Sequence, residues 1–84
     1  MKVSQFHAKN QFLIMDGSKQ TFQSYDSVIA VTEPGKQTVL DEKYWDWSRT
    51  TGKYRNMFLG EGIAETRKKI DNGTYQLANL NDAN

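Results

Sequence analysis

Residues 44–55 carry the side chains of this sequence that are best suited to binding another molecule. Four aromatic rings, three cations and three aliphatic hydroxyl groups fall within these twelve residues. Aromatic faces stack on nucleobases or anchor a protein partner, while Arg and Lys neutralise phosphate or carboxylate groups. Trp, Tyr and Arg also dominate the energetics of many protein interfaces. Both a protein and a nucleic acid are therefore chemically suited partners.

The aromatic rings of this segment are also needed for the core of so short a chain. We expect Trp45, Tyr54 and Phe58 to lie at least partly in the interior. Tyr44, Trp45 and Trp47 cannot all face inward from a strand or a turn, and Trp47 is the best candidate for an exposed ring. The sequence leaves open whether Trp45 and Trp47 belong to the core or to the surface.

Positive charge gathers in the second half of the chain. Residues 48–70 contain six cations and two anions, although the net charge of the whole chain is only +1. An asymmetric charge distribution can orient a charged partner, and solvated helix faces are the alternative explanation. We predict a partner-binding surface made of two rings and these six cations, namely Tyr44, Trp47, Arg49, Lys53, Arg55, Arg67, Lys68 and Lys69.

Groups that could support catalysis or bind a metal are scarce. The sole histidine, His7, falls in an early strand, and there is no cysteine to act as a nucleophile. The three acidic residues between Asp41 and Asp46 fit neither a calcium loop nor a histidine-containing metal site. Helix capping, or pairing with Lys43 and Arg49, explains them better. We therefore expect no enzymatic activity, no metal and no cofactor.

The first half of the chain is expected to form the sheet that supports residues 44–55. Short runs of aromatic and β-branched residues predict strands over residues 3–8, 11–15, 20–25, 27–32 and 36–40. Asp16-Gly17 and Pro34-Gly35 suit tight turns between them. The irregular spacing of Phe22 and Tyr25 predicts a bulge near residues 24–26. The pattern indicates an antiparallel meander of four or five strands.

The second half changes to helical spacing. Tyr54 and Phe58 lie one turn apart on a helix that Ser48 or Thr50 can cap and that Gly60 can end.

A second helix is predicted over residues 63–71, with Glu65 facing Lys69 across one turn. A final strand over residues 74–77 can return to the sheet edge, and the tail from about residue 81 should fray. The sequence thus predicts an α+β fold, with the meander packed against two short helices of the C-terminal half.

The whole chain of 84 residues fits a single domain over residues 1–84, without a linker or repeat. The absence of cysteine is compatible with a reducing cytoplasm, and no apolar run approaches the roughly 20 residues that span a bilayer. We expect a soluble, cytoplasmic protein without membrane contact. Its oligomeric state stays open, because an edge strand of an open sheet can pair into a dimer.

A pattern spread over residues 3–81 resembles a group of small uncharacterised bacteriophage proteins of Gram-positive hosts. Its parts are Phe22-Gln23-Ser24-Tyr25, Ile29-Ala30, Leu40-Asp41, Tyr44-Trp45-Asp46, Ser48-Arg49-Thr50-Thr51, Lys53-Tyr54-Arg55, Phe58-Leu59-Gly60 and Lys68-Lys69-Ile70. The resemblance implies a phage origin and action in the cytoplasm of an infected bacterium, with no catalytic residues to carry over. Small phage proteins often resemble stoichiometric inhibitors or adaptors of host machinery, including anti-CRISPR proteins.

Two functions follow from these expectations. The first is an inhibitor or adaptor that acts by direct contact on a host nucleic-acid-handling enzyme, such as a nuclease. The second is a small nucleic-acid-binding protein that uses the aromatic and basic surface. The near-neutral net charge places the second function behind the first.

Overall fold

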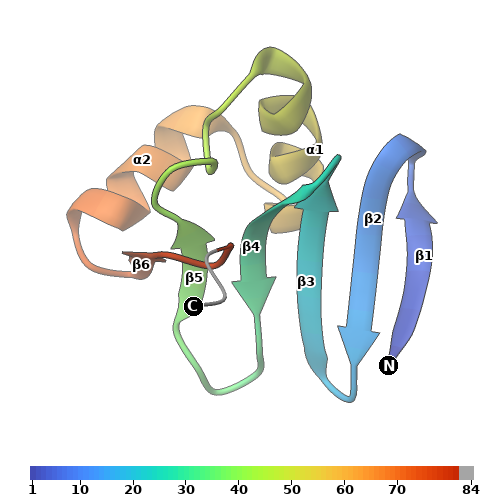
Figure 1. Ribbon diagram of the computed structural model, residues 1–84. Coiled ribbons are helices and arrows are strands. Elements are labelled where there is room, and N and C mark those ends of the chain that lie inside the picture. Colours follow the sequence, from blue (N-terminus) through green and yellow to red (C-terminus); the bar gives the residue numbers. More distant parts are fainter. Residues whose placement is uncertain (82–84) are drawn as a thin grey trace.

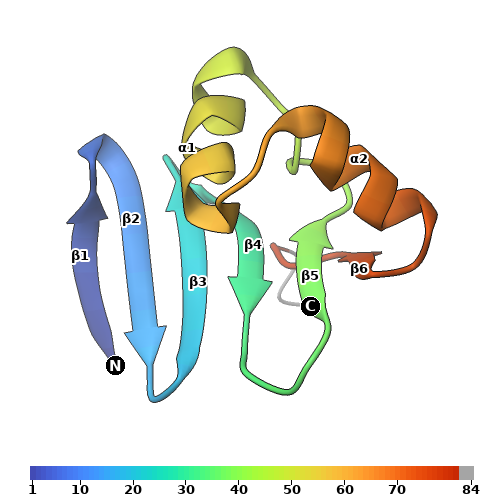
Figure 2. The ribbon, with the colours of Figure 1, turned by 180° about the vertical axis from the view of Figure 1, so that it is seen from behind.

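The computed structural model describes residues 1–81 and shows a six-stranded sheet with two helices packed on one of its faces (Figures 1 and 2). The elements are β1 (Lys2–Phe6), β2 (Ala8–Asp16), β3 (Lys19–Ser24), β4 (Ser27–Thr32), β5 (Thr38–Asp41), α1 (Arg49–Leu59), α2 (Ile63–Asp71) and β6 (Tyr75–Ala78). The order of the strands in the sheet follows the chain. Strands β1 to β5 are antiparallel neighbours, and β6 pairs with β5 in parallel at the edge. The predicted α+β meander with two helices in the C-terminal half is confirmed.

The first hairpin differs from the predicted strand over residues 3–8. The chain reverses at His7, whose φ is 65°, so that Phe6 pairs with Ala8. Strand β2 then passes through Asn10 at a φ of 68°, and the register between β1 and β2 shifts in this region. Asn is one of the few residue types that tolerate the left-handed region, so Asn10 kinks a continuing strand instead of ending it.

The predicted bulge near residues 24–26 is also displaced. The register between β3 and β4 shifts between Phe22 and Gln23, and Ser24 then pairs with Ser27. Residues 25–26 are consequently a two-residue turn, in which Tyr25 takes a φ of 55°. The irregularity that was predicted as a bulge at residues 24–26 is therefore a turn between β3 and β4.

The core lies between the sheet and α1. Phe22 of β3 is fully buried, and its ring stacks on Phe58 of α1 with 5.7 Å between centroids. Phe6 closes this cluster, 5.6 Å from Phe22. Helix α1 lies over β3 and β4, while α2 lies beside β6. Neither helix among residues 1–81 is long and apolar enough to cross a membrane.

The ends of α1 follow local capping chemistry. The Ser48 side chain accepts a hydrogen bond from the backbone N–H of Thr51 at 3.1 Å, so that Ser48, and not Thr50, is the N-cap. Gly60 ends the helix at a φ of 71° and donates its N–H to the carbonyl of Asn56. These two caps fix where α1 begins and where it ends.

Asn81, the first residue of the predicted frayed tail, is hydrogen-bonded to β4. Its side chain accepts the N–H of Val28 at 2.6 Å and donates to the Val28 carbonyl at 2.9 Å. This pair satisfies both backbone groups of a residue near the start of β4. The rest of the predicted frayed tail, residues 82–84, lies outside the described residues.

Phe22→Ala should lower the free energy of unfolding by about 3–5 kcal/mol, because it empties the space between β3 and α1. Chemical denaturation followed by circular dichroism measures this loss. Phe12→Ala is the matched control, since Phe12 is half-buried on the opposite face of the sheet and should cost clearly less. Equal losses for the two variants would contradict this location of the core.

Candidate functional site

A pocket of about 260 Å³ lies beside the N-terminal end of α1. We call it the aromatic pocket; it is lined by Ser24, Tyr25, Ser27, Ile29, Tyr44, Trp47, Ser48 and Thr51. The side chain of Trp47 is 61% exposed and that of Tyr25 is 53% exposed. The Tyr44 and Trp47 rings meet edge to face, 4.9 Å apart. The prediction that Trp47 is an exposed ring is confirmed, whereas Trp45, Tyr54 and Phe58 are half-buried as expected.

Tyr25 was not among the predicted site residues. It reaches the pocket from the turn between β3 and β4, where its positive φ is rare for a bulky side chain. Such a conformation carries a strain of roughly 1 kcal/mol or more, and strained residues are enriched at functional sites. The irregularity predicted near residues 24–26, with an aromatic residue in it, was the signal that could have identified it.

The floor of the aromatic pocket is polar. The Thr51 hydroxyl donates to the Ser24 hydroxyl at 3.2 Å, and both residues are buried. The Ser48 hydroxyl donates to Thr51 Oγ1 at 3.2 Å. This chain of hydroxyl groups ties the start of α1 to the end of β3 and leaves oxygen atoms beneath the exposed rings.

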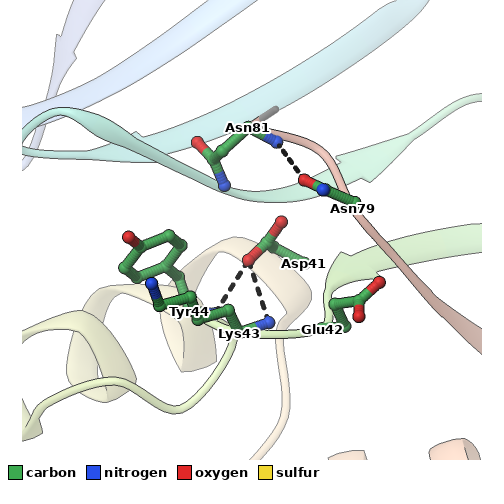
Figure 3. A pocket seen from close by; sticks show the side chains of 6 residues that line it. All are labelled: Asp41, Glu42, Lys43, Tyr44, Asn79 and Asn81. Carbon is green, nitrogen blue, oxygen red and sulfur yellow. Dashed lines mark hydrogen bonds between the residues drawn. The ribbon is translucent and has the colours of Figure 1, made fainter. Parts of the chain in front are cut away.

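Asp41, at the end of β5, holds the loop that carries Tyr44 and Trp47. Its carboxylate accepts the backbone N–H groups of Lys43 at 3.0 Å and Tyr44 at 2.8 Å (Figure 3). It also accepts the N–H of Leu80 at 2.8 Å, which joins the loop to the segment after β6. Burial alone would raise the pKa of Asp41, but these hydrogen bonds and one from Asn81 outweigh it and hold the pKa below its usual value.

A second pocket, of about 360 Å³, surrounds this carboxylate. Figure 3 shows its lining residues, which are Asp41, Glu42, Lys43, Tyr44, Asn79 and Asn81. The Asp41 oxygens are already engaged by backbone donors, and no group of acidic or histidine side chains among residues 1–81 could hold a metal ion. We therefore assign Asp41 a structural role, which is to hold the loop in place.

Arg55 braces the same loop from inside. Its side chain is only 1% exposed and donates to the Trp45 carbonyl at 2.7 Å and to Asp46 at 3.1 Å. Asp46 also accepts from Arg67 of α2 at 3.1 Å, and both guanidinium groups lie within 6 Å of the Trp45 ring. The prediction that Arg55 lies on the partner-binding surface is therefore wrong, because its guanidinium group is buried. Asp46 was expected to pair with Lys43 or Arg49, but it pairs with Arg55 and Arg67.

A shallow hollow on the other side of Ser48 carries exposed cations. We call it the basic hollow; it is lined by Asp46, Ser48, Arg49, Gly52, Lys53, Arg55, Asn56 and Ile63. Arg49 and Lys53 are exposed on its rim, and neither forms an ion pair with a residue of the described chain. Because Ser48 lines both depressions, the aromatic pocket and the basic hollow form one continuous surface.

Helix α2 contributes less to this surface than predicted. Lys68 is exposed but lines neither depression. Lys69 binds Glu61 at 2.6 Å, not Glu65 as expected. Of the predicted site residues, Tyr44, Trp47, Arg49 and Lys53 therefore lie together around the two depressions. Arg67 is connected to this surface by its bond to Asp46, whereas Lys68 and Lys69 line neither depression.

Glu61 is the centre of a separate polar network. Besides Lys69, it accepts from the Tyr75 hydroxyl at 2.9 Å and from the Thr66 hydroxyl at 2.7 Å. Burial raises the pKa of Glu61, and the bonds from Lys69, Thr66 and Tyr75 more than compensate, so its pKa lies below the usual value. The network fastens α2 to β6 and has a structural role.

Acid should weaken the fold through Asp41 and Glu61. A carboxylate whose pKa falls on folding adds stability above its unfolded-state pKa, and this stability is lost as the pH falls through the folded-state pKa. The reference values are 3.8 for Asp41 and 4.5 for Glu61, so the free energy of unfolding should decline from about pH 5 downward. Urea denaturation across this range measures the decline.

The double variant Asp41→Asn, Glu61→Gln should be less stable near neutral pH and should show a flatter acid profile. Glu42→Gln is its control, because Glu42 is an exposed carboxylate of the same loop. An acid profile of the double variant as steep as that of the wild type would show that other groups govern the acid response.

Residues 1–74 match the model of a family of unknown function (DUF8033). No curated protein and no solved structure matches the chain significantly. The family description includes no phage origin, host or activity. The match spans every element from β1 to α2, and with them the aromatic pocket and the basic hollow. Because it covers most of the sequence, the chain belongs to this family of unknown function (DUF8033).

Proposed function

We propose that this protein acts by binding a partner protein through the aromatic pocket and the basic hollow. One observation carries the proposal: two rings exposed by more than half, Tyr25 and Trp47, flank a pocket that adjoins Arg49 and Lys53, which form no ion pair within residues 1–81. Large exposed rings beside a depression are typical of interaction sites. Trp, Tyr and Arg are the residue types that most often anchor protein interfaces.

The dimensions of the aromatic pocket suit a side chain of a partner. Its volume of about 260 Å³ is below the roughly 300–1,000 Å³ of pockets that enclose a drug-sized small molecule. A single large side chain of a partner can enter it and contact Tyr44 and Trp47. Arg49 and Lys53 then lie within reach of carboxylates next to that side chain. The proposed role is non-catalytic.

Charge pairing favours a protein over a nucleic acid. Of the six cations between residues 48 and 70, Arg55 and Arg67 share Asp46, and Lys69 is paired with Glu61. A nucleic-acid interface draws most of its affinity from cations that are free to replace counterions on phosphates. The pairing leaves only part of the basic cluster available for that exchange.

In its most specific form, the proposal is an inhibitor or adaptor of a host nucleic-acid-handling enzyme, such as a nuclease. This form rests on the resemblance to small phage proteins, including anti-CRISPR proteins, and places the action in the host cytoplasm. Nucleic-acid binding is the alternative. It is favoured by the rings of Tyr25 and Trp47, which are open to stacking beside two exposed cations.

Trp47→Ala should weaken binding to the partner by about 2 kcal/mol or more, which is roughly a thirtyfold rise in Kd. The partner is first isolated by affinity capture from host lysate, and its Kd is then measured by calorimetry with purified proteins. Met57→Ala is the matched control, since Met57 is exposed on the same helix as Arg49 but lines neither depression. Equal affinities of the two variants would refute this location of the interface.

A salt titration separates the two candidate partners. If the ligand is nucleic acid, log K should fall linearly with log salt, with a slope of about −1.4 to −1.8 for two phosphate contacts made by Arg49 and Lys53. A protein partner anchored by Trp47 should show a weaker dependence, because its main contact is apolar. Tight binding of single-stranded oligonucleotides with the steep slope, and no captured protein, would establish the alternative.

A further inference from the structure

One edge of the sheet lies open along its whole length. Strand β1 is the terminal strand opposite β6, and no other segment of residues 1–81 covers its outer side (Figures 1 and 2). Lys2, Val3, Ser4 and Gln5 are exposed. An uncovered edge strand presents unpaired N–H and C=O groups that can template another strand, and proteins usually block such edges with charges or proline. Strand β1 has no proline and a single charge.

A row of β-branched residues crosses the sheet and ends on this edge. Strand pairing aligns Val39, Val31, Thr21, Ile14 and Val3 side by side. The row lies on the face away from the helices, because the adjacent Phe22 points into the core beneath α1. Its inner members are half-buried by their neighbours, whereas Val3 is 57% exposed. Val3 thus has a cross-strand neighbour, Ile14, on one side only, whereas each inner member has one on both sides.

Two further exposed apolar side chains lie near the start of this edge. Met1 lies two residues from Val3, and Met15 pairs with Lys2, so its side chain lies on the face of the sheet opposite to Val3. Together with Val3 they account for three of the seven large apolar side chains that are exposed among residues 1–81. Exposed apolar side chains beside an unpaired strand edge favour association over solvation.

We infer that β1 pairs with β1 of a second copy of this chain, antiparallel and centred on Val3. A two-fold axis at Val3 places it opposite the Val3 of the second copy and continues the β-branched row across both sheets. In this register Lys2 lies opposite Ser4 of the other copy, so no like charges face each other directly. The contact uses an edge distant in the sheet from β6 and does not depend on the proposed function.

Sedimentation velocity over a concentration series tests the inference on the wild-type protein. The wild type should form a dimer in a concentration-dependent way. Val3→Lys places two ammonium groups opposite each other and should raise the dimer dissociation constant about tenfold or more. Leu77→Lys is the matched control, because Leu77 is an exposed apolar residue on the other edge strand. Its dimer should persist.

Single-cysteine variants provide a second test that does not require Val3→Lys to fold. The chain contains no cysteine, so Val3→Cys offers one thiol. Side chains directly opposite in an antiparallel pair have Cβ atoms about 4.5–5.5 Å apart, close enough for a disulfide after a small adjustment. Under mild oxidation, Val3→Cys should form a disulfide-linked dimer much faster than Leu77→Cys.

The outcomes are distinct. A wild-type dimer weakened by Val3→Lys, with preferential cross-linking of Val3→Cys, supports the β1 contact. A wild type that stays monomeric up to about millimolar concentration, together with equal cross-linking of the two cysteine variants, overturns it. Weakening by Leu77→Lys alone would overturn it as well and would move the contact to β6.

Discussion

The buried carboxylate of Asp41 is the interaction on which the candidate surface depends. It lies where β5 ends, and it binds the backbone of the following loop at Lys43 and Tyr44. The same group binds Leu80, after β6 has returned to the sheet. A buried charge is tolerated only when hydrogen bonds replace its hydration, and here backbone donors from two distant segments do so. Two parts of the chain are thereby held in one place by one side chain.

In the loop between β5 and α1, some side chains pack against the rest of the protein and others are exposed. Trp45 lies against Arg55 and Arg67, and Asp46 forms an ion pair with each of the two guanidinium groups. This braced side gives the loop a fixed shape. Trp47 consequently projects outward from a rigid support, which reduces the ordering cost that a flexible anchor would add on binding. The buried Arg55 thus holds the loop from which the exposed Trp47 projects.

Local sequence signals predicted much of the fold. The turn at Asp16-Gly17, the cap at Gly60 and the extent of α2 depend on neighbouring residues, and each was predicted. For the N-cap of α1 the sequence left a choice between Ser48 and Thr50, and Ser48 is the cap. The reversal at His7 was missed because no glycine or proline marks it. Its geometry is set by the pairing of β1 with β2 and by the kink at Asn10.

The candidate site was less predictable, because it depends on contacts between distant residues. Residue type and spacing indicated that Trp47 is exposed, but they could not show that Arg55 turns inward to the Trp45 carbonyl. Tyr25 joins the pocket only because β3 and the loop before α1 meet in space. The partner of Lys69 also depends on tertiary structure, since Glu61 precedes α2 and reaches back to it. Periodicity within one helix cannot reveal such a pair.

The two indole N–H signals of this protein permit the most direct test of the central claim, because Trp45 and Trp47 are its only tryptophans. Their nitrogen–proton NMR resonances can be followed while unlabelled partner is added. If the aromatic pocket is the docking surface, the Trp47 signal shifts or broadens in step with binding, and the Trp45 signal, braced by two arginines, changes much less. A complex that forms while the Trp47 signal stays unchanged would contradict the account.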